Sequence, residues 1–428
     1  MTTLIFGLGL TGRSCFEYLN QEQIIAYDSQ FHCDQDLEKK IRKEYSNVQL
    51  VGMPDFIESF AIADRLIVSP GISLNHDVVK KARSAGLPIS SDIDLFMETN
   101  PKKVIAITGT NGKSTVTSLV AEMMSGKQVG VGGNLGPPAL DLLQHKFSTH
   151  VLELSSFQLE RMRRWHFEAA CILNITRDHL DRYESFEKYA RVKHRIYGSC
   201  NWAVYNGSDQ LTSPDLPHPR GIPIGSNEQF AIETDGIVIG GTYVSSENIG
   251  IVGRHNLFNA TAAAALAFTQ GIGVDRLRYC LAGFVGLPHR CQLVTVQSGV
   301  KFIDDSKATN VGSCLAALAG FGDESRRNII LLAGGDGKGA DFELLFPAVE
   351  RFVKHTVLFG QDAKKIQSAL RGLSTSEASD FESAVLEAAN RAKPGDYVLL
   401  SPACSSLDMF DGFEHRGKEF SMIVERFG

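Results

Sequence analysis

The segment that most constrains the fold is residues 104–115, VIAITGTNGKST, where an apolar, β-branched run breaks into a glycine-rich turn. Apolar residues then recur at helical spacing, at Val116, Leu119, Val120 and Met123, so the sequence predicts a strand, a short loop and a helix. This arrangement directs backbone N–H groups and the positive end of the helix toward one point, which suits the phosphates of a nucleotide. We therefore predict a nucleotide triphosphate site on a parallel α/β sheet.

Side chains at the end of this loop have the chemistry that a triphosphate needs. Lys113 can reach the outer phosphates, and Ser114 or Thr115 can bind magnesium. Only two residues separate Gly109 from Gly112, whereas four separate the glycines of the common phosphate loop. A chance Gly-x-x-Gly-Lys-Ser loop is the alternative, and the flanking strand and helix patterns favour nucleotide binding over it.

The bulk composition indicates a soluble enzyme of several domains. A length of 428 residues corresponds to about two to four domains. The net charge of −6 disfavours nucleic acid or an anionic membrane as the main partner. The eight cysteines form no Cys-x-x-Cys pair, so we expect reduced thiols. The start of the chain lacks the basic region of a signal peptide, and the Ala-rich run 257–274 predicts a buried helix rather than a membrane span. We expect a cytoplasmic protein.

Strand-like and helix-like patterns alternate along the chain, which is typical of parallel α/β architecture. They divide into three predicted domains, at residues 1–100, 101–286 and 287–428. We expect strands at residues 3–6, 24–28, 66–68, 151–154, 171–175, around Phe302, and at 329–333, 356–359 and 397–400, a helix at 185–197, and an irregular connection at 209–225.

The first domain opens with a second glycine motif, Gly7-x-Gly9-x-x-Gly12, directly after a predicted strand. With Asp28 at the end of the next strand, it matches the fingerprint that binds NAD. The glycines allow a pyrophosphate to approach a helix N-terminus, however, and UDP carries a pyrophosphate as NAD does. Residues 69–71, Ser-Pro-Gly, follow another apolar strand and either border the same groove or form an ordinary turn.

Three polar residues of the second domain occupy positions where chemistry is a strong alternative to a structural role. Glu153 lies in an apolar strand and is either a magnesium ligand or a partnered buried acid. His179 follows another apolar strand on a loop, where a surface histidine is the alternative. Lys193 falls on the apolar stripe of a predicted helix, so it either extends its amine to solvent or takes part in the chemistry.

Longer motifs resemble those of the Mur ligase family, a group of ATP-dependent amide ligases, in the expected order and over essentially the whole chain. They are ELSSFQLE at 153–160, LNITRDHLDRY at 173–183, the Lys193 helix, HNLFNA at 255–260, LPHR at 287–290, DSKATN at 305–310, GGDGKGADF at 334–342 and SPACSSLDMF at 401–410. The glycine opening, DSKATN and SPACSSLDMF resemble the branch that adds D-glutamate to UDP-N-acetylmuramoyl-L-alanine through an acyl phosphate, in cytoplasmic peptidoglycan precursor synthesis.

The resemblance implies a Rossmann-like UDP-binding domain, a central ATP-binding domain and a Rossmann-like amino-acid-binding domain. For ATP it implies Gly109, Thr110, Asn111, Gly112, Lys113, Ser114, Thr115, Asn259, Arg290 and Asp305. For the UDP substrate it implies Leu10, Thr11, Asp28, Ser29, Gly71, Asn134 and Ser155. For D-glutamate it implies Lys307, Thr309, Lys338, Ser406, Leu407 and Phe413.

The same resemblance implies catalytic roles for Lys113, Glu153, His179 and Lys193, and two magnesium ions. Ser114 and Glu153 would bind one ion, and His179 would bind the other with Lys193 as a CO₂-derived carbamate. Burial and nearby metal charge favour the neutral amine of Lys193, which can react with CO₂. The carbamate is an anionic oxygen ligand of the kind that magnesium prefers.

Because the implied site residues come from all three domains, we expect the third domain to close over ATP and exclude water. We expect only small-molecule partners, no nucleic acid, no membrane insertion and a monomer. An NAD-dependent oxidoreductase leaves the loop at 109–115 and Lys307 without a role. A nucleotide-hydrolysing switch leaves the first glycine groove and the third domain unexplained. Another Mur ligase or a folylpolyglutamate synthase is the nearer alternative.

Overall fold

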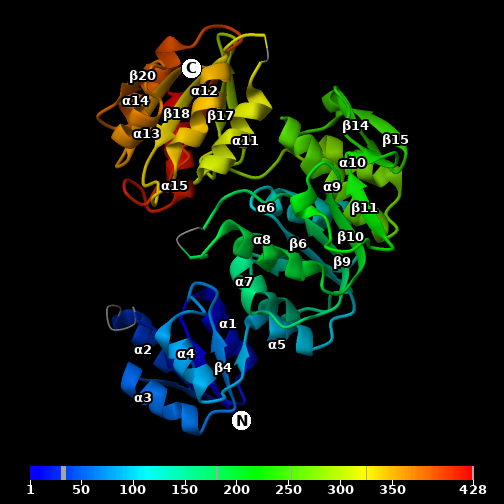
Figure 1. The fold of residues 1–428 in the computed structure, drawn as a ribbon, viewed down its shortest axis with the longest axis vertical. Coiled ribbons are helices and arrows are strands. Elements are labelled where there is room, and N and C mark those ends of the chain that lie inside the picture. Colours follow the sequence, from blue (N-terminus) through cyan, green and yellow to red (C-terminus); the bar gives the residue numbers. More distant parts are fainter. Residues whose placement is uncertain (30–34, 180–181, 252, 324, 427–428) are drawn as a thin grey trace. The chain divides into compact units, whose positions relative to one another are not determined.

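The computed structural model describes residues 1–29, 35–179, 182–251, 253–323 and 325–426 (Figure 1). It contains three α/β domains, each built on its own sheet. The chain divides into two compact units, one of Met1–Ile175, His179–Phe230 and Ala262–Leu277, and one of Thr176–Asp178, Ala231–Thr261 and Arg278–Gly428. The domain boundaries predicted at 100/101 and 286/287 stay a prediction.

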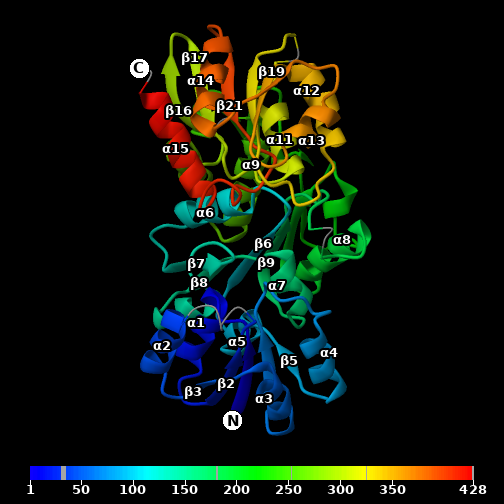
Figure 2. The ribbon, with the colours of Figure 1, turned by 90° about the vertical axis from the view of Figure 1, so that its left-hand side faces the viewer.

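The first sheet is parallel and has the strand order β3-β2-β1-β4-β5. Its strands are β1 (Thr2–Phe6), β2 (Gln23–Tyr27), β3 (Val48–Leu50), β4 (Arg65–Val68) and β5 (Ile89–Ser90), and its helices are α1 (Leu10–Tyr18), α2 (Gln35–Glu44), α3 (Met53–Glu58), α4 (Asp77–Ser84) and α5 (Asp92–Glu98) (Figures 1 and 2). Both faces of the sheet are buried, because Leu4 and Phe6 pack in one apolar cluster and Ile5 in another. The chain order reverses between β1 and β4, which is where open α/β sheets bind ligands.

The second sheet is also parallel, in the order β11-β10-β9-β6-β8-β7. Its strands are β6 (Val104–Thr108), β7 (Val129–Gly133), β8 (Thr149–Glu153), β9 (Phe167–Ile172), β10 (Cys200–Asn206) and β11 (Gly221–Ile224), and the accompanying helices are α6 (Lys113–Met123), α7 (Ser156–Arg161) and α8 (Phe186–His194). Every residue of β6 is buried, which explains why this strand reads as one apolar run. The predicted strand, glycine loop and helix are confirmed.

The third sheet has the order β16-β17-β21-β18-β19-β20 and is parallel except for its antiparallel edge strand β16. Its strands are β16 (Gln292–Gln297), β17 (Val300–Asp304), β18 (Ile329–Gly334), β19 (Val353–Phe359), β20 (Thr375–Glu377) and β21 (Tyr397–Leu400), and its helices are α11 (Val311–Phe321), α12 (Phe346–Phe352), α13 (Ala363–Ala369), α14 (Phe381–Arg391) and α15 (Phe413–Glu425). Leu331 and Leu332 pack in different apolar clusters, so both faces of this sheet are covered as well.

The remaining elements include short strands and two longer helices. They are β12 (Ser226–Asn227), β13 (Phe230–Ala231), β14 (Gly236–Ile239), β15 (Thr242–Ser245), α9 (Arg254–Thr269) and α10 (Val274–Gly283). The predicted Ala-rich helix is confirmed as α9, in which the alanines from Ala262 to Ala267 are fully buried. Within the described ranges, no helix combines the length and apolar character that crossing a membrane requires.

Three local expectations need correction. The strand expected at 171–175 ends at Ile172, and the helix expected at 185–197 is α8 followed by a 3₁₀ turn, Arg195–Tyr197. Residues 209–225 are not wholly irregular, because Gly221–Ile224 forms β11. Pro223 is tolerated there because β11 is the edge strand of its sheet, where a missing N–H need not break the ladder.

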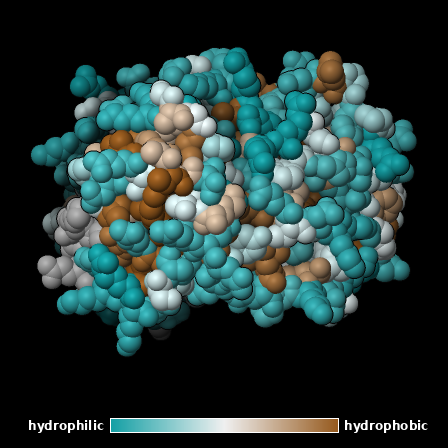
Figure 3. Space-filling model, turned by 90° about the horizontal axis from the view of Figure 1, so that it is seen from below, coloured by the Kyte–Doolittle hydropathy of each residue, from teal (hydrophilic) through white to brown (hydrophobic). Residues whose placement is uncertain are grey.

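The surface and the thiols are those of an ordinary globular protein. The face in Figure 3 is mostly hydrophilic, with apolar residues gathered in a few patches. Free thiols occur at Cys15, Cys171, Cys200, Cys280, Cys291, Cys314 and Cys404, as expected. The expectation for Cys33 falls outside the described residues.

Candidate active site

The phosphate loop after β6 has the backbone geometry that only glycine adopts readily. Gly109 and Gly112 have φ angles of 157° and 82°, which lie in the region that favours glycine. A side chain at Gly109 would also meet the Cβ of Leu173 at 3.0 Å. Gly112 is the N-cap of α6, so the loop leads the chain into a helix N-terminus that can face phosphate.

Asn174 holds the loop in place, a role that the sequence did not reveal. Its backbone carbonyl accepts from Thr110 N at 2.9 Å, its side-chain oxygen accepts from Asn111 N at 2.8 Å, and its side-chain amide donates to Asn111 O at 3.0 Å. Asn174 follows β9, the neighbour of β6, so adjacent strands deliver the loop and its support to the same edge of the sheet.

Two lysines meet at one carbonyl of this loop. Lys113 Nζ donates to Gly109 O at 2.9 Å and to Thr110 O at 2.8 Å, and Lys193 Nζ donates to Gly109 O at 2.9 Å. Lys193 is only 1% exposed, which confirms its expected place on the buried face of α8. Its amine also lies 4.8 Å from the ring centre of Tyr189, whose hydroxyl is 3.1 Å from Thr110 Oγ1.

Glu153, at the end of β8, accepts hydrogen bonds from two other predicted site residues. Its carboxylate is buried and accepts from Ser114 Oγ at 2.7 Å through Oε2 and from Asn134 Nδ2 at 2.7 Å through Oε1. Asn134 follows β7, so β6, β8 and β7 bring these three side chains together. A hydroxyl beside a carboxylate is the donor set that magnesium uses next to nucleotide phosphates, so these residues fit a magnesium ion.

Ser155 and His179 lie beside this cluster. Ser155 caps α7, with its hydroxyl accepting from Gln158 N at 3.2 Å and its own N–H donating to Gln158 Oε1 at 3.0 Å. His179 is exposed, has φ 54°, and places its ring 4.7 Å from the Phe157 ring and 6.5 Å from the Tyr189 ring. No group of three or more histidine, cysteine or acidic side chains suited to a metal occurs among the described residues. A magnesium ion here would therefore also need phosphate or water oxygens, which is its usual habit.

The glycine motif of the first domain forms a tight turn at the carboxyl ends of β1 and β4. Gly7 has φ 105°, and a side chain there would lie 2.6 Å from Ser69 Cβ. A side chain at Gly12 would lie 2.0 Å from Gly7 O. Asp28 accepts from Leu8 N at 2.7 Å, so its carboxylate supports the turn itself.

Other residues predicted for this groove reach the surface. Leu10 is 69% exposed, Thr11 is partly buried, and Ser29 and Gly71 are exposed. They are therefore accessible to a ligand at the same edge of the sheet.

In the third domain the structure brings Lys307 and Phe413 together. Lys307 Nζ lies 3.7 Å from the ring centre of Phe413, and Ser306 Oγ donates to Phe413 O at 2.9 Å. His289 joins them, because its carbonyl accepts from Lys307 N at 3.0 Å and its Nδ1 lies 2.6 Å from Asp304 Oδ2. The sequence did not predict this His289–Asp304 pair. Its only indication was that His289 belongs to the LPHR motif at 287–290.

Asp305 is buried in the same segment. Its carboxylate accepts from Ser401 Oγ at 2.8 Å and from Cys291 N at 3.2 Å. Burial raises the pKa of Asp305 to about 7, and the hydrogen bonds from Ser401 and Cys291 oppose that rise. The protonation of the Asp305 carboxyl therefore changes near neutral pH.

A buried arginine binds the ends of the strands that precede the other residues predicted to bind D-glutamate. Arg416 is fully buried and donates to Ser306 Oγ at 3.0 Å, Ser306 O at 2.8 Å, Cys404 O at 3.2 Å and Gly334 O at 3.5 Å. These acceptors follow or end the neighbouring strands β17, β21 and β18. The sequence gave no indication of this role for Arg416.

The other predicted residues of the third domain and of α9 vary in exposure. On the loop after β18, Lys338 is exposed with φ 50°. On the loop after β21, Ser406 is buried and Leu407 is 66% exposed. Thr309 and Arg290 are partly buried, and Asn259 is buried on α9 with its amide donating to Asn256 Oδ1 at 3.0 Å.

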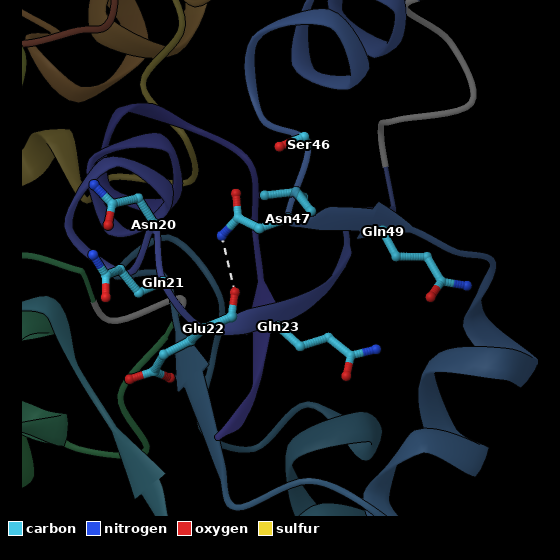
Figure 4. A pocket seen from close by; sticks show the side chains of 8 residues that line it. Asn20, Gln21, Glu22, Gln23, Ser46, Asn47 and Gln49 are labelled. Carbon is cyan, nitrogen blue, oxygen red and sulfur yellow. Dashed lines mark hydrogen bonds between the residues drawn. The ribbon is translucent and has the colours of Figure 1, made fainter.

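A separate hollow of about 440 Å³ lies at the other edge of the first sheet (Figure 4). It is lined by Asn20, Gln21, Glu22, Gln23, Ser46, Asn47, Val48 and Gln49. Gln23 and Val48 begin β2 and β3, whereas the glycine turn lies at the strand ends. Asn47 donates to Glu22 O at 2.9 Å across it. This hollow contains none of the predicted site residues.

Models of three protein-family domains match the chain. The Mur ligase MurD-like N-terminal domain matches residues 1–91, the Mur ligase middle domain residues 107–267, and the Mur ligase glutamate ligase domain residues 289–404. The matched segments carry the glycine turn, the phosphate loop and Lys307, respectively.

Curated relatives match along nearly their whole length. Proteins of Pseudomonas aeruginosa and Marinobacter nauticus are 41% and 42% identical over 99% of this chain and 97% and 98% of their own. A protein of Legionella pneumophila is 41% identical over 98% of both chains. All three are named UDP-N-acetylmuramoylalanine--D-glutamate ligase.

Solved structures share the fold at low sequence identity. A pseudomurein peptide ligase type C from Methanothermus fervidus has a TM-score of 0.62 at 18% identity and is covered, like this chain, over 100% of its length. A UDP-N-acetylmuramate-alanine ligase from Thermotoga maritima has a TM-score of 0.59 at 19% identity, with 100% of this chain and 99% of that chain covered. Both support the three-domain architecture.

Proposed function

Because the chain belongs to the Mur ligase family, we propose that it uses ATP to join D-glutamate to UDP-N-acetylmuramoyl-L-alanine, in cytoplasmic peptidoglycan precursor synthesis. The observation that carries this proposal is the cluster at the ends of β6 and β8, where Ser114 donates to Glu153 and the neighbouring Lys113 donates to the Gly109 carbonyl. It offers a cation, a helix N-terminus and magnesium-type oxygen donors at one point. The names of the relatives at about 41% identity supply the substrates.

The reaction follows from the chemistry of amide formation. The alanyl carboxylate must be activated before an amine can attack it, and phosphoryl transfer from ATP gives an acyl phosphate. The attack of a carboxylate on a triphosphate brings two anions together, so positive charge is needed where negative charge gathers. We propose that Lys113 and the N-terminus of α6 provide it on the enzyme side.

Magnesium fits the same cluster. Ser114 and Glu153 would hold one ion, since their oxygens already lie 2.7 Å apart. His179 and a carbamylated Lys193 would hold a second ion. When bound, magnesium neutralises phosphate charge. Asn134 keeps the Glu153 carboxylate oriented through the hydrogen bond to Oε1.

The remaining groups bind the substrates. ATP would contact the rest of the loop, Gly109, Thr110, Asn111, Gly112 and Thr115, together with Asn259, Arg290 and Asp305. The UDP substrate would contact Leu10, Thr11, Asp28, Ser29, Gly71, Asn134 and Ser155. D-Glutamate has two carboxylates, and Lys307, Thr309, Lys338, Ser406, Leu407 and Phe413 would form its pocket.

The experiment that tests this proposal is ADP formation with each substrate omitted in turn. An amide ligase that forms an acyl phosphate turns over ATP continuously only when the UDP substrate and the amino acid are both present, because the amine must consume the acyl phosphate before the next cycle. ATP hydrolysis at the full rate without the amino acid would contradict a ligase. Binding of NAD by calorimetry without binding of UDP would assign the glycine groove of the first domain to a dinucleotide instead.

A further inference from the structure

Two arginines bind the backbone of residues 68–72, which comprise the last residue of β4 and the start of the loop that leads to α4. Arg161, at the end of α7, donates through Nη1 to Val68 O at 3.0 Å and to Ser69 O. Its Nη2 donates to Pro70 O at 3.2 Å and to Ile72 O at 2.8 Å. One guanidinium group therefore binds four carbonyl oxygens of a single loop.

Arg182 completes this set from a different segment. Its Nη1 donates to Pro70 O at 3.0 Å and Gly71 O at 3.3 Å, and its Nη2 donates to Ile72 O at 3.0 Å. Its guanidinium lies 3.9 Å from the ring centre of Phe157 on α7. Each of the five carbonyls from residue 68 to residue 72 thus accepts from at least one arginine.

This arrangement is costly for a role that is only packing. Arg161 is 6% exposed, and burying a charge is unfavourable unless the charge is well paired. Burial, together with the like charge of Arg182, lowers the pKa of Arg161 to about 10, and the charges of Glu160 and Asp92 oppose this shift. The two guanidinium groups together supply side-chain donors to all five of these carbonyls, of which Ser69 O also accepts from Ile72 N at 3.0 Å.

The loop that they hold forms one wall of the glycine groove. Ser69 Oγ donates to Gly7 O at 3.0 Å, and a side chain at Gly7 would also lie 2.9 Å from Ile72 Cδ1. Gly71 is exposed beside this contact. A displacement of the loop would therefore also displace the glycine turn at Gly7, where we propose that the pyrophosphate binds.

The arginines also connect this wall to the second domain. Arg161 is the last residue of α7, the helix that Ser155 caps and that begins shortly after Glu153. Arg182 lies three residues after His179, and its Nη2 also donates to Glu160 Oε2 of α7 at 3.3 Å. The groove and the magnesium-type cluster are thus linked through one short helix.

We propose that Arg161, acting with Arg182, is a positioning residue for the UDP substrate: it fixes the 68–72 wall of the glycine groove against α7. In this way it sets the distance between the site for the diphosphate and the site where the carboxylate reacts. This inference rests on the proposed function, because it needs a substrate with a diphosphate at one end and a carboxylate at the other.

Loss of Arg161 should selectively weaken the affinity for the UDP substrate. Without Arg161, Val68 O and Ser69 O lose their arginine donors, and the loop must be ordered at the moment of binding. Ordering a loop on binding weakens affinity without a change in contacts. Arg161→Met should therefore raise KM for the UDP substrate and the Kd for UDP by roughly tenfold, while KM for ATP stays the same.

The test compares Arg161→Met and Arg161→Lys with the control Arg163→Met in the full-length protein. Arg163 lies just beyond α7 and pairs with Glu98 and Asp94 of the first domain, but it does not touch residues 68–72. The measurements are KM for each substrate, kcat, and UDP binding by calorimetry. Arg163→Met should stay within about twofold of the parent in both KM values.

Arg161→Lys keeps the charge but cannot reproduce the fork of donors, so it should show the same selective loss to a smaller extent. It also serves if Arg161→Met fails to fold. An unchanged Kd for UDP in a folded Arg161→Lys or Arg161→Met, or an equal rise of KM for ATP, would overturn the inference. A parent protein that binds no UDP and forms no product would instead overturn the proposed function.

Discussion

Lys113 and Lys193 donate to the same atom, the carbonyl oxygen of Gly109, each at 2.9 Å. When both amines are protonated they repel each other, and the burial of Lys193 adds to the preference for its neutral amine. A bound phosphate would attract Lys113, and a carbamate would reverse the charge of Lys193. The two changes that we propose for the loaded enzyme therefore both relieve this repulsion.

The first prediction concerns Lys113. Lys113→Ala should fold and lose activity by about 10²–10³-fold, which is typical for the loss of one preorganised group that stabilises charge. The measurement is the ADP-forming rate together with thermal unfolding. Lys102→Ala, an exposed lysine just before β6, is the control and should keep full activity. A Lys113→Ala rate above about a tenth of the parent rate would contradict the role.

The second prediction concerns the carbamate. Lys193→Arg keeps a positive charge but cannot react with CO₂, so activity should collapse. Lys193→Ala should also be inactive and should recover partly when a small carboxylate such as acetate occupies the vacated site. Rates with and without added carboxylate provide the measurement. Full activity of Lys193→Arg would show that a plain cation suffices there.

The third prediction places amino-acid selectivity in the third domain. Lys338 is exposed on the loop after β18 and is available to a carboxylate of glutamate. Lys338→Ala should raise the apparent KM for D-glutamate by at least about tenfold, or 1.4 kcal/mol, and leave KM for ATP unchanged. Lys364→Ala, an exposed lysine on α13, is the control. An unchanged glutamate KM in Lys338→Ala would show that the pocket lies elsewhere.

The fourth prediction is a pH dependence of stability. Burial raises the pKa of Asp305 from 3.8 to about 7 in the folded chain. The folded state then holds a proton that the unfolded state has lost, so this residue makes the free energy of unfolding fall as the pH rises from about 4 to 7. Asp305→Asn lacks the effect, so the parent should lose thermal stability relative to the variant as the pH rises from about 4 to about 7. A constant difference between the two melting temperatures would refute it.

The sequence predicted those parts of the fold that depend on local pattern. Strand β21 was expected at its observed residues, because buried parallel strands read as continuous apolar runs. The phosphate loop was predicted because glycine spacing reports a backbone requirement directly. Pro223 misled the prediction, since only the sheet topology shows that β11 is an edge strand.

The sequence did not predict the contacts that support the site. Lys193 binds a carbonyl 84 residues away, and Arg416 binds one 82 residues away. Carbonyl groups belong to every residue, so no residue type marks them as partners. Arg161 and Asn174 were missed for the same reason, because both act on backbone atoms of a distant loop.

The central claim is that this chain joins D-glutamate to a UDP-linked substrate. The most direct measurement is mass spectrometry of the product when UDP-N-acetylmuramoyl-L-alanine, ATP and magnesium are supplied with D-glutamate, L-glutamate, L-alanine or D-alanine. We predict that D-glutamate alone gives a product heavier by one glutamyl residue, with one ADP formed per product. A product with another amino acid and none with D-glutamate would contradict the claim.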